Sequence, residues 1–126
     1  MLVAVPNWNG RVSPLFDTAT RLTLAEVSGG RTAITGERLL AGIPPPWRAR
    51  YLADQGVEVL ICGGISRPLA GMLGALGIRV LPWVTGEVSE VLEAFAGGRL
   101  PAPQFLMPGC GRHRHRFRHG LRPWWR

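Results

Sequence analysis

The stretch GVEVLICGGIS, residues 56–66, decides the fold. Residues 57–62 are rich in Val, Leu and Ile, which is typical of a strand buried on both faces of a sheet. Gly63 and Gly64 permit a tight turn, and Ser66 is a favourable N-cap for a following helix. That helix has an apolar stripe at i, i+3, i+4 and i+7: Leu69, Met72, Leu73 and Leu76. The segment therefore predicts a strand–turn–helix unit.

Similar signals lie on both sides of this unit. We expect four further strands and two further helices: strands at 1–5, 21–27, 32–40 and 78–83, helices at 47–55 and 87–96. Pro6 is expected to end the first strand, and residues 7–14 read as a polar loop. Strand–helix–strand connections require parallel neighbours, whereas the early hairpin adds antiparallel strands. The expected fold class is α/β, a mixed sheet of about five strands with flanking helices.

Charge divides the chain into a domain and a tail. The net charge is +7, yet residues 1–107 hold nine Arg against eight acidic residues, whereas residues 108–126 hold six Arg and no acidic residue. We predict an α/β domain at 1–105 and a flexible Arg/His-rich tail at 106–126. Such a polycation favours an anionic partner, which could be nucleic acid, a lipid surface or an anionic cofactor.

The sequence predicts neither a membrane span nor an enzyme. A span needs about 20 consecutive apolar residues, and the longest uncharged run is 100–111. No signal peptide is evident, so we expect a cytoplasmic protein with reduced cysteines. Residues 64–68 only approximate a nucleophile elbow, because Pro68 stands at the second Gly position. Strand 1–5 has no carboxylate for a two-metal nuclease.

A ligand of an open α/β sheet lies beyond the carboxyl ends of the parallel strands. Three segments are expected to converge there: residues 6–7, 62–67 and 82–83. The glycines let a ligand approach the backbone, a helix N-terminus offers N–H groups to an anion, and Arg67 adds a positive charge. The same loop is equally consistent with an ordinary turn that follows a buried thiol, and both interpretations stay open.

The tail carries a second candidate site. Its metal-ligating residue types lie within ten positions: Cys110, His113, His115 and His119. The interleaved arginines repel a bare cation and favour a ligand that is itself negative. A disordered basic extension that binds metal fortuitously is the alternative.

The chain resembles the dinitrogenase iron–molybdenum cofactor biosynthesis family, which includes cluster carriers and a molybdenum–copper orange protein. The resemblance extends from residue 1 to about residue 100 and rests on five segments: VAVP (3–6), RVSPLFD (11–17), GVEVLICGGI (56–65), LGIRV (76–80) and GEVSEVL (86–92). It implies a ribonuclease-H-like fold and non-catalytic binding of a molybdenum- or iron-containing sulfide cluster. Many members have Ser-x-His-Phe-Gly-Arg where residues 13–18 read SPLFDT, so Leu15 replaces the histidine, whose role is not carried over.

Our leading hypothesis is a non-catalytic carrier or assembly protein for such a cluster, with cluster donor and acceptor proteins as partners. Cys62 is expected to be the soft ligand of the cluster. The anion-binding loop is expected to comprise Gly63, Gly64, Ile65, Ser66 and Arg67. The residues expected to face this loop across the cluster are Asn7, Ser13 and Phe16. Cys62 is expected to contribute more than Cys110, since ordering flexible backbone costs about 1–2 kcal/mol per residue. The tail would add Cys110 and the histidines. Two alternatives are a module that binds nucleic acid or an acidic protein through the tail, and a tail-borne zinc or nickel binder.

Overall fold

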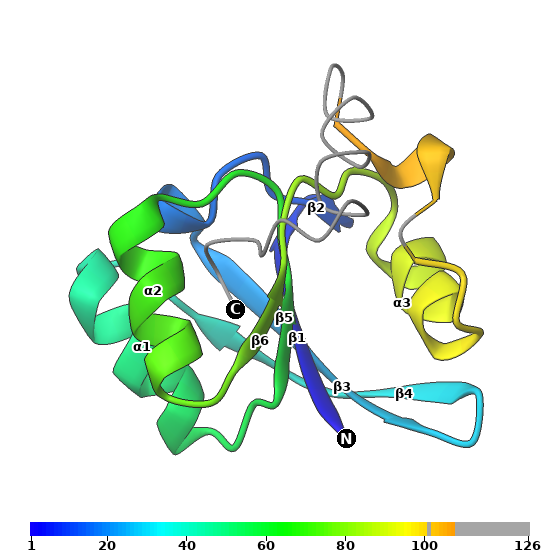
Figure 1. Cartoon of the computed structure of the whole chain (residues 1–126), viewed down its shortest axis with the longest axis horizontal. Coiled ribbons are helices and arrows are strands. Elements are labelled where there is room, and N and C mark those ends of the chain that lie inside the picture. Colours follow the sequence, from blue (N-terminus) through cyan, green and yellow to red (C-terminus); the bar gives the residue numbers. More distant parts are fainter. Residues whose placement is uncertain (101, 108–126) are drawn as a thin grey trace.

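A computed structural model describes residues 1–100 and 102–107. Its sheet has the strand order β4-β3-β1-β5-β6, and β2 pairs with β1 (Figure 1). The elements are β1 (Leu2–Trp8), β2 (Arg11–Val12), η1 (Phe16–Thr18), β3 (Arg21–Ser28), β4 (Arg31–Leu39), α1 (Pro45–Asp54), β5 (Val59–Ile61), α2 (Arg67–Ala75), β6 (Arg79–Leu81), α3 (Val88–Ala96) and η2 (Pro103–Phe105). Strands β1, β5 and β6 are parallel, whereas β3 and β4 are antiparallel additions. The predicted mixed α/β fold is confirmed.

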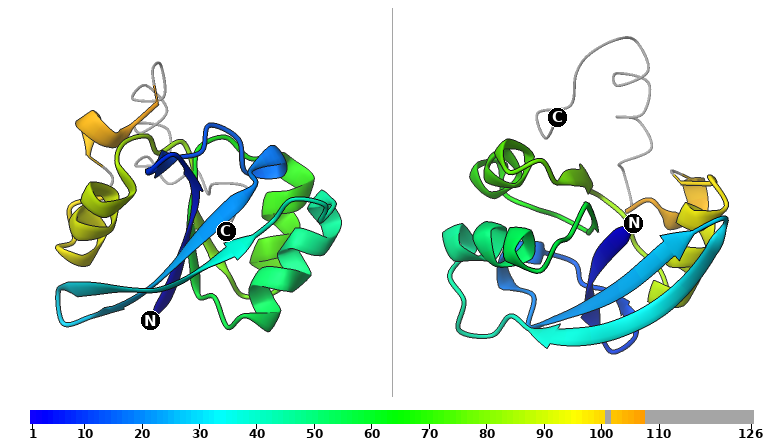
Figure 2. Two further views of the ribbon diagram at one scale, coloured as in Figure 1. Left: turned by 180° about the vertical axis from the view of Figure 1, so that it is seen from behind. Right: turned by 90° about the horizontal axis from the view of Figure 1, so that it is seen from below.

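Helices cover both faces of the sheet. Figures 1 and 2 place α1 and α2 on one face and α3 on the other. Alternate residues of the central strands point into the two cores: Ala4 and Leu60 pack on the α1–α2 side, whereas Val3 and Val59 pack on the α3 side. This alternation explains why the central strands are continuously apolar in sequence, because each side chain is buried on one face or the other.

The first strand departs from the prediction. Strand β1 continues through Pro6 to Trp8 and forms a hairpin with β2, so residues 7–12 are paired strand and turn instead of an open loop. The two turn residues, Asn9 and Gly10, have φ of 52° and 85°. This conformation fits the two-residue Asn-Gly turn that joins antiparallel strands with the correct twist. The hairpin extends the sheet toward the expected ligand edge.

The described chain packs on the fold as far as Met107. Leu106 forms a bridge to Val84, and the Met107 N–H donates to the Trp83 carbonyl oxygen at 2.9 Å. The division at residues 105 and 106 stays a prediction, and the segment from 108 onward lies outside the described residues. Among residues 1–100 and 102–107, no helix is long and apolar enough to cross a membrane.

Candidate functional site

Three loops meet at the carboxyl ends of β1, β5 and β6, at the top of Figure 1. The first contains η1, the second follows β5, and the third follows β6. The Gly64 N–H donates to the Pro14 carbonyl oxygen at 2.7 Å, and the Phe16 N–H donates to the Gly64 carbonyl oxygen at 2.8 Å. The Trp83 N–H donates to the Gly63 carbonyl oxygen at 2.9 Å. The three loops therefore form one hydrogen-bonded rim.

Gly63 is needed for contact between two of these loops. A Cβ atom at this position would lie 2.6 Å from the Ser13 carbonyl oxygen and 2.7 Å from that of Pro14. Both distances are far below ordinary van der Waals contact, and both oxygens belong to backbone. The sequence suggested that a ligand approaches the Gly63 backbone. In the structure, the backbone of Ser13 and Pro14 packs against Gly63 instead.

The Asp17 carboxylate lies at the N-terminus of α2, where the sequence suggested an anionic ligand. Asp17 accepts hydrogen bonds from the Ser66 N–H at 2.9 Å and from the Ser66 hydroxyl at 2.5 Å. Ser66 is the N-cap residue of α2, as expected, but its side chain makes no capping hydrogen bond to the helix because its hydroxyl binds Asp17. The interaction of a carboxylate with a helix N-terminus is favourable, and here the protein supplies that anion itself.

Arg48 of α1 binds the backbone of the first loop, an interaction that was not predicted from the sequence. It is 5% exposed. Its guanidinium donates to four carbonyl oxygens: Phe16 at 2.9 Å, Ala19 at 2.6 Å, Leu40 at 3.1 Å and Ile43 at 2.8 Å. Burial lowers the pKa of Arg48 from its ordinary value, and the nearby negative charge of Asp17 opposes that shift. A buried cation thus ties η1 to α1.

Cys62 lies inside the α1–α2 core, with no exposed surface. Its sulfur faces the same side of the sheet as Leu60, two residues earlier. Burial raises the pKa of the Cys62 thiol, and the charge of Asp17 raises it further. A metal ligand must be a thiolate, which this environment disfavours. The position argues against Cys62 as the first group to meet a cluster, although its ligation stays a prediction.

Thiol labelling provides a direct check on this environment. In a Cys110→Ser variant, Cys62 is the one remaining cysteine. We expect a disulfide reagent to modify it at least about 100-fold more slowly in native buffer than in urea, because only the thiolate of an opened molecule reacts. The reaction is followed by absorbance. Equal rates in buffer and urea would contradict the buried, neutral thiol.

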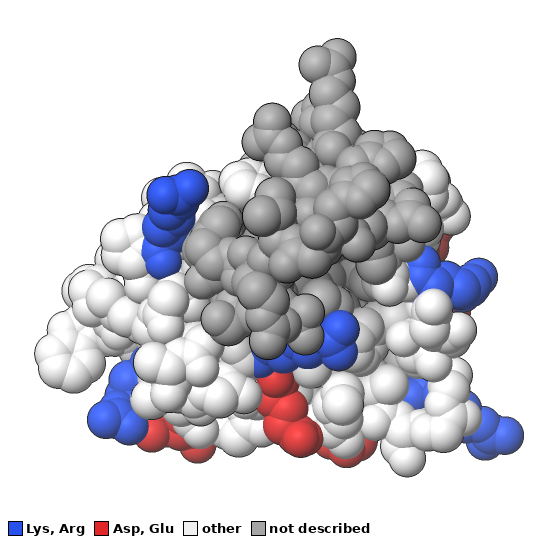
Figure 3. Space-filling view, in the orientation of Figure 1, with Lys and Arg blue, Asp and Glu red and all other residues white. Residues whose placement is uncertain are grey.

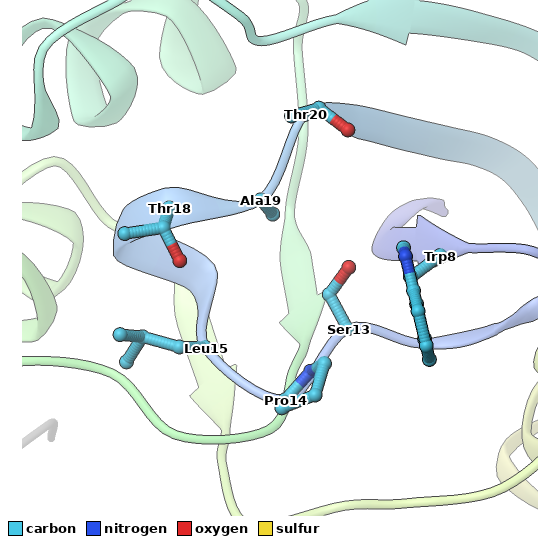
Figure 4. Close-up of a pocket in the computed structure, with 7 residues that line it drawn as sticks. All are labelled: Trp8, Ser13, Pro14, Leu15, Thr18, Ala19 and Thr20. Atoms are coloured by element: carbon cyan, nitrogen blue, oxygen red, sulfur yellow. The ribbon is translucent and has the colours of Figure 1, made fainter.

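A pocket of about 360 Å³ opens beside these loops. Its lining residues are Trp8, Ser13, Pro14, Leu15, Thr18, Ala19 and Thr20. Figure 4 shows the Trp8 ring on one side, Leu15 and Thr18 on the other, and the Ser13 hydroxyl between them. No charged side chain lines this pocket. It combines hydroxyl groups with apolar surface and suits a polarisable ligand more than a bare cation.

Only some of the residues predicted to bind the cluster lie at this pocket. Ser13 lines it, whereas Phe16 is fully buried in the α1–α2 core. The Asn7 amide donates to the Thr23 hydroxyl at 3.0 Å, and its oxygen accepts from the Gly10 N–H at 2.7 Å, so this side chain holds the hairpin turn. Ile65 is 5% exposed. Arg67 is exposed at the start of α2.

No cluster of three or more His, Cys, Asp or Glu side chains that could hold a metal ion occurs within the described part of the chain. The tail ligands suggested by the sequence, Cys110, His113, His115 and His119, lie outside it. The last described residue, Met107, is hydrogen-bonded to Trp83 at the same sheet edge. The chain therefore enters its Cys- and His-containing segment from beside the candidate site.

Comparison with known proteins gives a family match. A family model described as dinitrogenase iron–molybdenum cofactor matches residues 1–98. No curated protein matches the sequence. A protein from Thermotoga, provisionally named as a NifB protein and solved by NMR, is 26% identical with a TM-score of 0.57, over 78% of this chain and 89% of that chain.

Two further solved structures share the fold. PH0822 is 24% identical with a TM-score of 0.76, over 82% of this chain and 95% of that chain. A provisionally named dinitrogenase from Methanocaldococcus jannaschii is 14% identical with a TM-score of 0.63, over 79% of this chain and 90% of that chain. The described α/β domain is thus an architecture found in several solved proteins.

Proposed function

The chain belongs to the dinitrogenase iron–molybdenum cofactor family, and we propose that it binds an anionic molybdenum- and/or iron-containing sulfide cluster as cargo. The family is involved in the biosynthesis of the iron–molybdenum cofactor. In our proposal the protein carries or assembles the cluster without catalysis and exchanges it with donor and acceptor proteins. The observation that carries this proposal is the family match over residues 1–98.

The chemical character of the residues that line the sheet-edge pocket is compatible with this cargo. A sulfide-bridged cluster is soft and polarisable, and it tolerates apolar neighbours better than a hydrated cation does. Ser13, Thr18 and Thr20 offer hydroxyl donors, while Trp8 and Leu15 offer apolar contact. The pocket supplies no countercharge. In our proposal the six arginines of residues 108–126 supply it.

We assign soft ligation to the tail, which reverses the order expected from the sequence, because Cys62 is fully buried. Cys110 follows Met107 by three residues, a span of at most about 10 Å. Met107 is hydrogen-bonded to Trp83 at the sheet edge, and in our proposal Cys110 reaches the cargo from this edge. His113, His115 and His119 are further nitrogen ligands in this proposal. Cys62 would reach the cargo only if the end of β5 opened.

Cysteine variants test this assignment. We expect Cys110→Ala to lower cluster loading at least about tenfold, whereas Cys62→Ala stays within about twofold of the parent protein, because the Cys62 thiol is buried and kept neutral. Loading is measured by Mo, Fe and sulfide analysis after anaerobic reconstitution with thiomolybdate, or with iron and sulfide. If Cys62→Ala folds normally and abolishes loading while Cys110→Ala is silent, the ligand belongs to the strand end and the tail assignment fails.

One observation favours a second candidate function, a module that binds nucleic acid or an acidic protein. It is the run of six arginines without an acidic residue at 108–126. Binding to DNA by charge alone weakens steeply as salt rises. Sequence-selective binding that persists at high salt would favour this second function over cargo binding. Stoichiometric zinc or nickel without sulfide in the isolated protein would favour a simple metal binder.

A further inference from the structure

Helix α2 lacks the polar outer face of an ordinary surface helix. Its sequence is RPLAGMLGA, in which Arg67 is the one polar side chain. Leu69, Ala70 and Leu73 face the core, and the outward positions continue with Met72, which is 38% exposed. A helix that is apolar on all sides is normally covered on all sides. The outer face of α2 therefore has the composition of a contact surface.

This face forms one wall of a groove against α1. The groove measures about 370 Å³ and is lined by Pro46, Trp47, Ala49, Arg50, Met72, Ala75 and Leu76; we call it the α1–α2 groove. Trp47 is 66% exposed and Leu76 is 39% exposed. Exposed Trp and Met side chains that flank a groove are typical of protein–protein contact sites.

The α1–α2 groove has one charged lining residue, Arg50, and the opposite charge of Asp54 lies one turn later on α1, outside the lining. Within the described part of the chain, no carboxylate forms an ion pair with Arg50 or with Arg67 at the start of α2. Figure 3 shows a largely uncharged surface over α1 and α2, with arginine side chains at its upper and lower ends and an acidic side chain beside the lower one. An occupant with acidic residues beside an apolar surface would complement this pattern.

We propose that the α1–α2 groove docks an amphipathic helix of a partner protein, with its apolar face on Trp47 and Met72 and an acidic residue opposite Arg50. Helices that lie in apolar grooves present such faces through i, i+3, i+4 and i+7 anchors. A second copy of this chain is a poorer occupant, because the groove lining holds an arginine and no carboxylate to face it across a symmetric interface. The inference does not depend on cluster binding.

The test uses the full chain without metal and two synthetic helical peptides. Both carry Leu at i, i+3, i+4 and i+7; one has Glu beside the apolar stripe, and its twin has Arg. We expect Trp47→Ala and Met72→Glu to weaken binding of the Glu peptide by about tenfold or more, as for central interface residues. Ile34→Ala and Ile34→Glu are the matched controls, since Ile34 is 63% exposed on the distant strand β4. They should bind as the parent protein does.

The basic tail is expected to attract any acidic peptide. Comparison of the variants therefore distinguishes binding at the α1–α2 groove from binding to the tail. Arg50→Glu leaves the tail unchanged and should reduce the preference for the Glu peptide over the Arg peptide by about tenfold. Fluorescence anisotropy measures each affinity, and thermal denaturation verifies that each variant folds. If all variants bind the Glu peptide alike, the inference is overturned. It is also overturned if sedimentation shows a dimer that Met72→Glu dissociates, because a second copy then covers the groove.

Discussion

Replacement of Arg48 by Met should lower the free energy of unfolding by about 3–5 kcal/mol, because it removes a buried charge-assisted network. Methionine retains much of the volume but removes the donor of the Ala19 and Ile43 carbonyl oxygens, whereas those of Phe16 and Leu40 each keep one backbone N–H. Urea denaturation followed by circular dichroism gives the value. Since Phe16 and Ala19 flank the first loop of the site, the same variant should also loosen the pocket.

Arg50→Met is the control on the same helix. Arg50 is exposed, and an exposed arginine without such a network should change stability by no more than about 0.5 kcal/mol. Equal effects of Arg48→Met and Arg50→Met would show that the four carbonyl bonds contribute little.

Gly63→Ala should destabilise the protein by about 3 kcal/mol, at the upper end of the usual cost of overpacking. The added methyl group would meet the Ser13 and Pro14 carbonyl oxygens, and neither backbone oxygen can rotate away as a side chain would. The loop of residues 13–16 must therefore move off the 63–64 turn or the fold must loosen. Urea denaturation measures the loss.

Gly71→Ala provides the matched comparison for Gly63→Ala. A Cβ at Gly71 meets nothing within 4 Å, and the residue lies inside α2. Alanine there should stabilise the protein by roughly 0.5–1 kcal/mol through helix propensity. Opposite signs for the two variants would locate the cost in the contact between loops, whereas equal small effects would refute it.

Most of the fold could be predicted because its strands and helices carry their own signals. Residues 57–62 are apolar at every position but one, and the stripe of α2 repeats with helical spacing. The hairpin of β1 and β2 could also have been predicted, since Asn9-Gly10 is a strong two-residue turn signal. We expected the first strand to end at Pro6 and a loop to follow, but the strand continues through Pro6.

The site was harder to predict because its interactions join distant segments. Asp17 and Ser66 are 49 residues apart, and neither residue type indicates the other. A buried arginine with carbonyl partners looks the same in sequence as an exposed one, so Arg48 was missed. The face of the sheet on which the Cys62 side chain lies could have been predicted. Residues two apart in a strand face the same way, and Leu60 is a core residue. Strand-end position alone does not decide whether a thiol meets solvent.

The central claim is that the pocket at the sheet edge receives an anionic cluster. Leu15 lines this pocket and is 41% exposed, so Leu15→Glu adds a negative charge there without disturbing the core. Ile34→Glu adds the same charge on β4, away from the pocket. The most direct measurement is the Mo, Fe and sulfide content of the parent protein and both variants after anaerobic reconstitution. We expect Leu15→Glu to load at least about tenfold less than Ile34→Glu, through repulsion in a partly desolvated site. Equal loading of the two variants, or a parent protein that takes up no cluster, would contradict the claim.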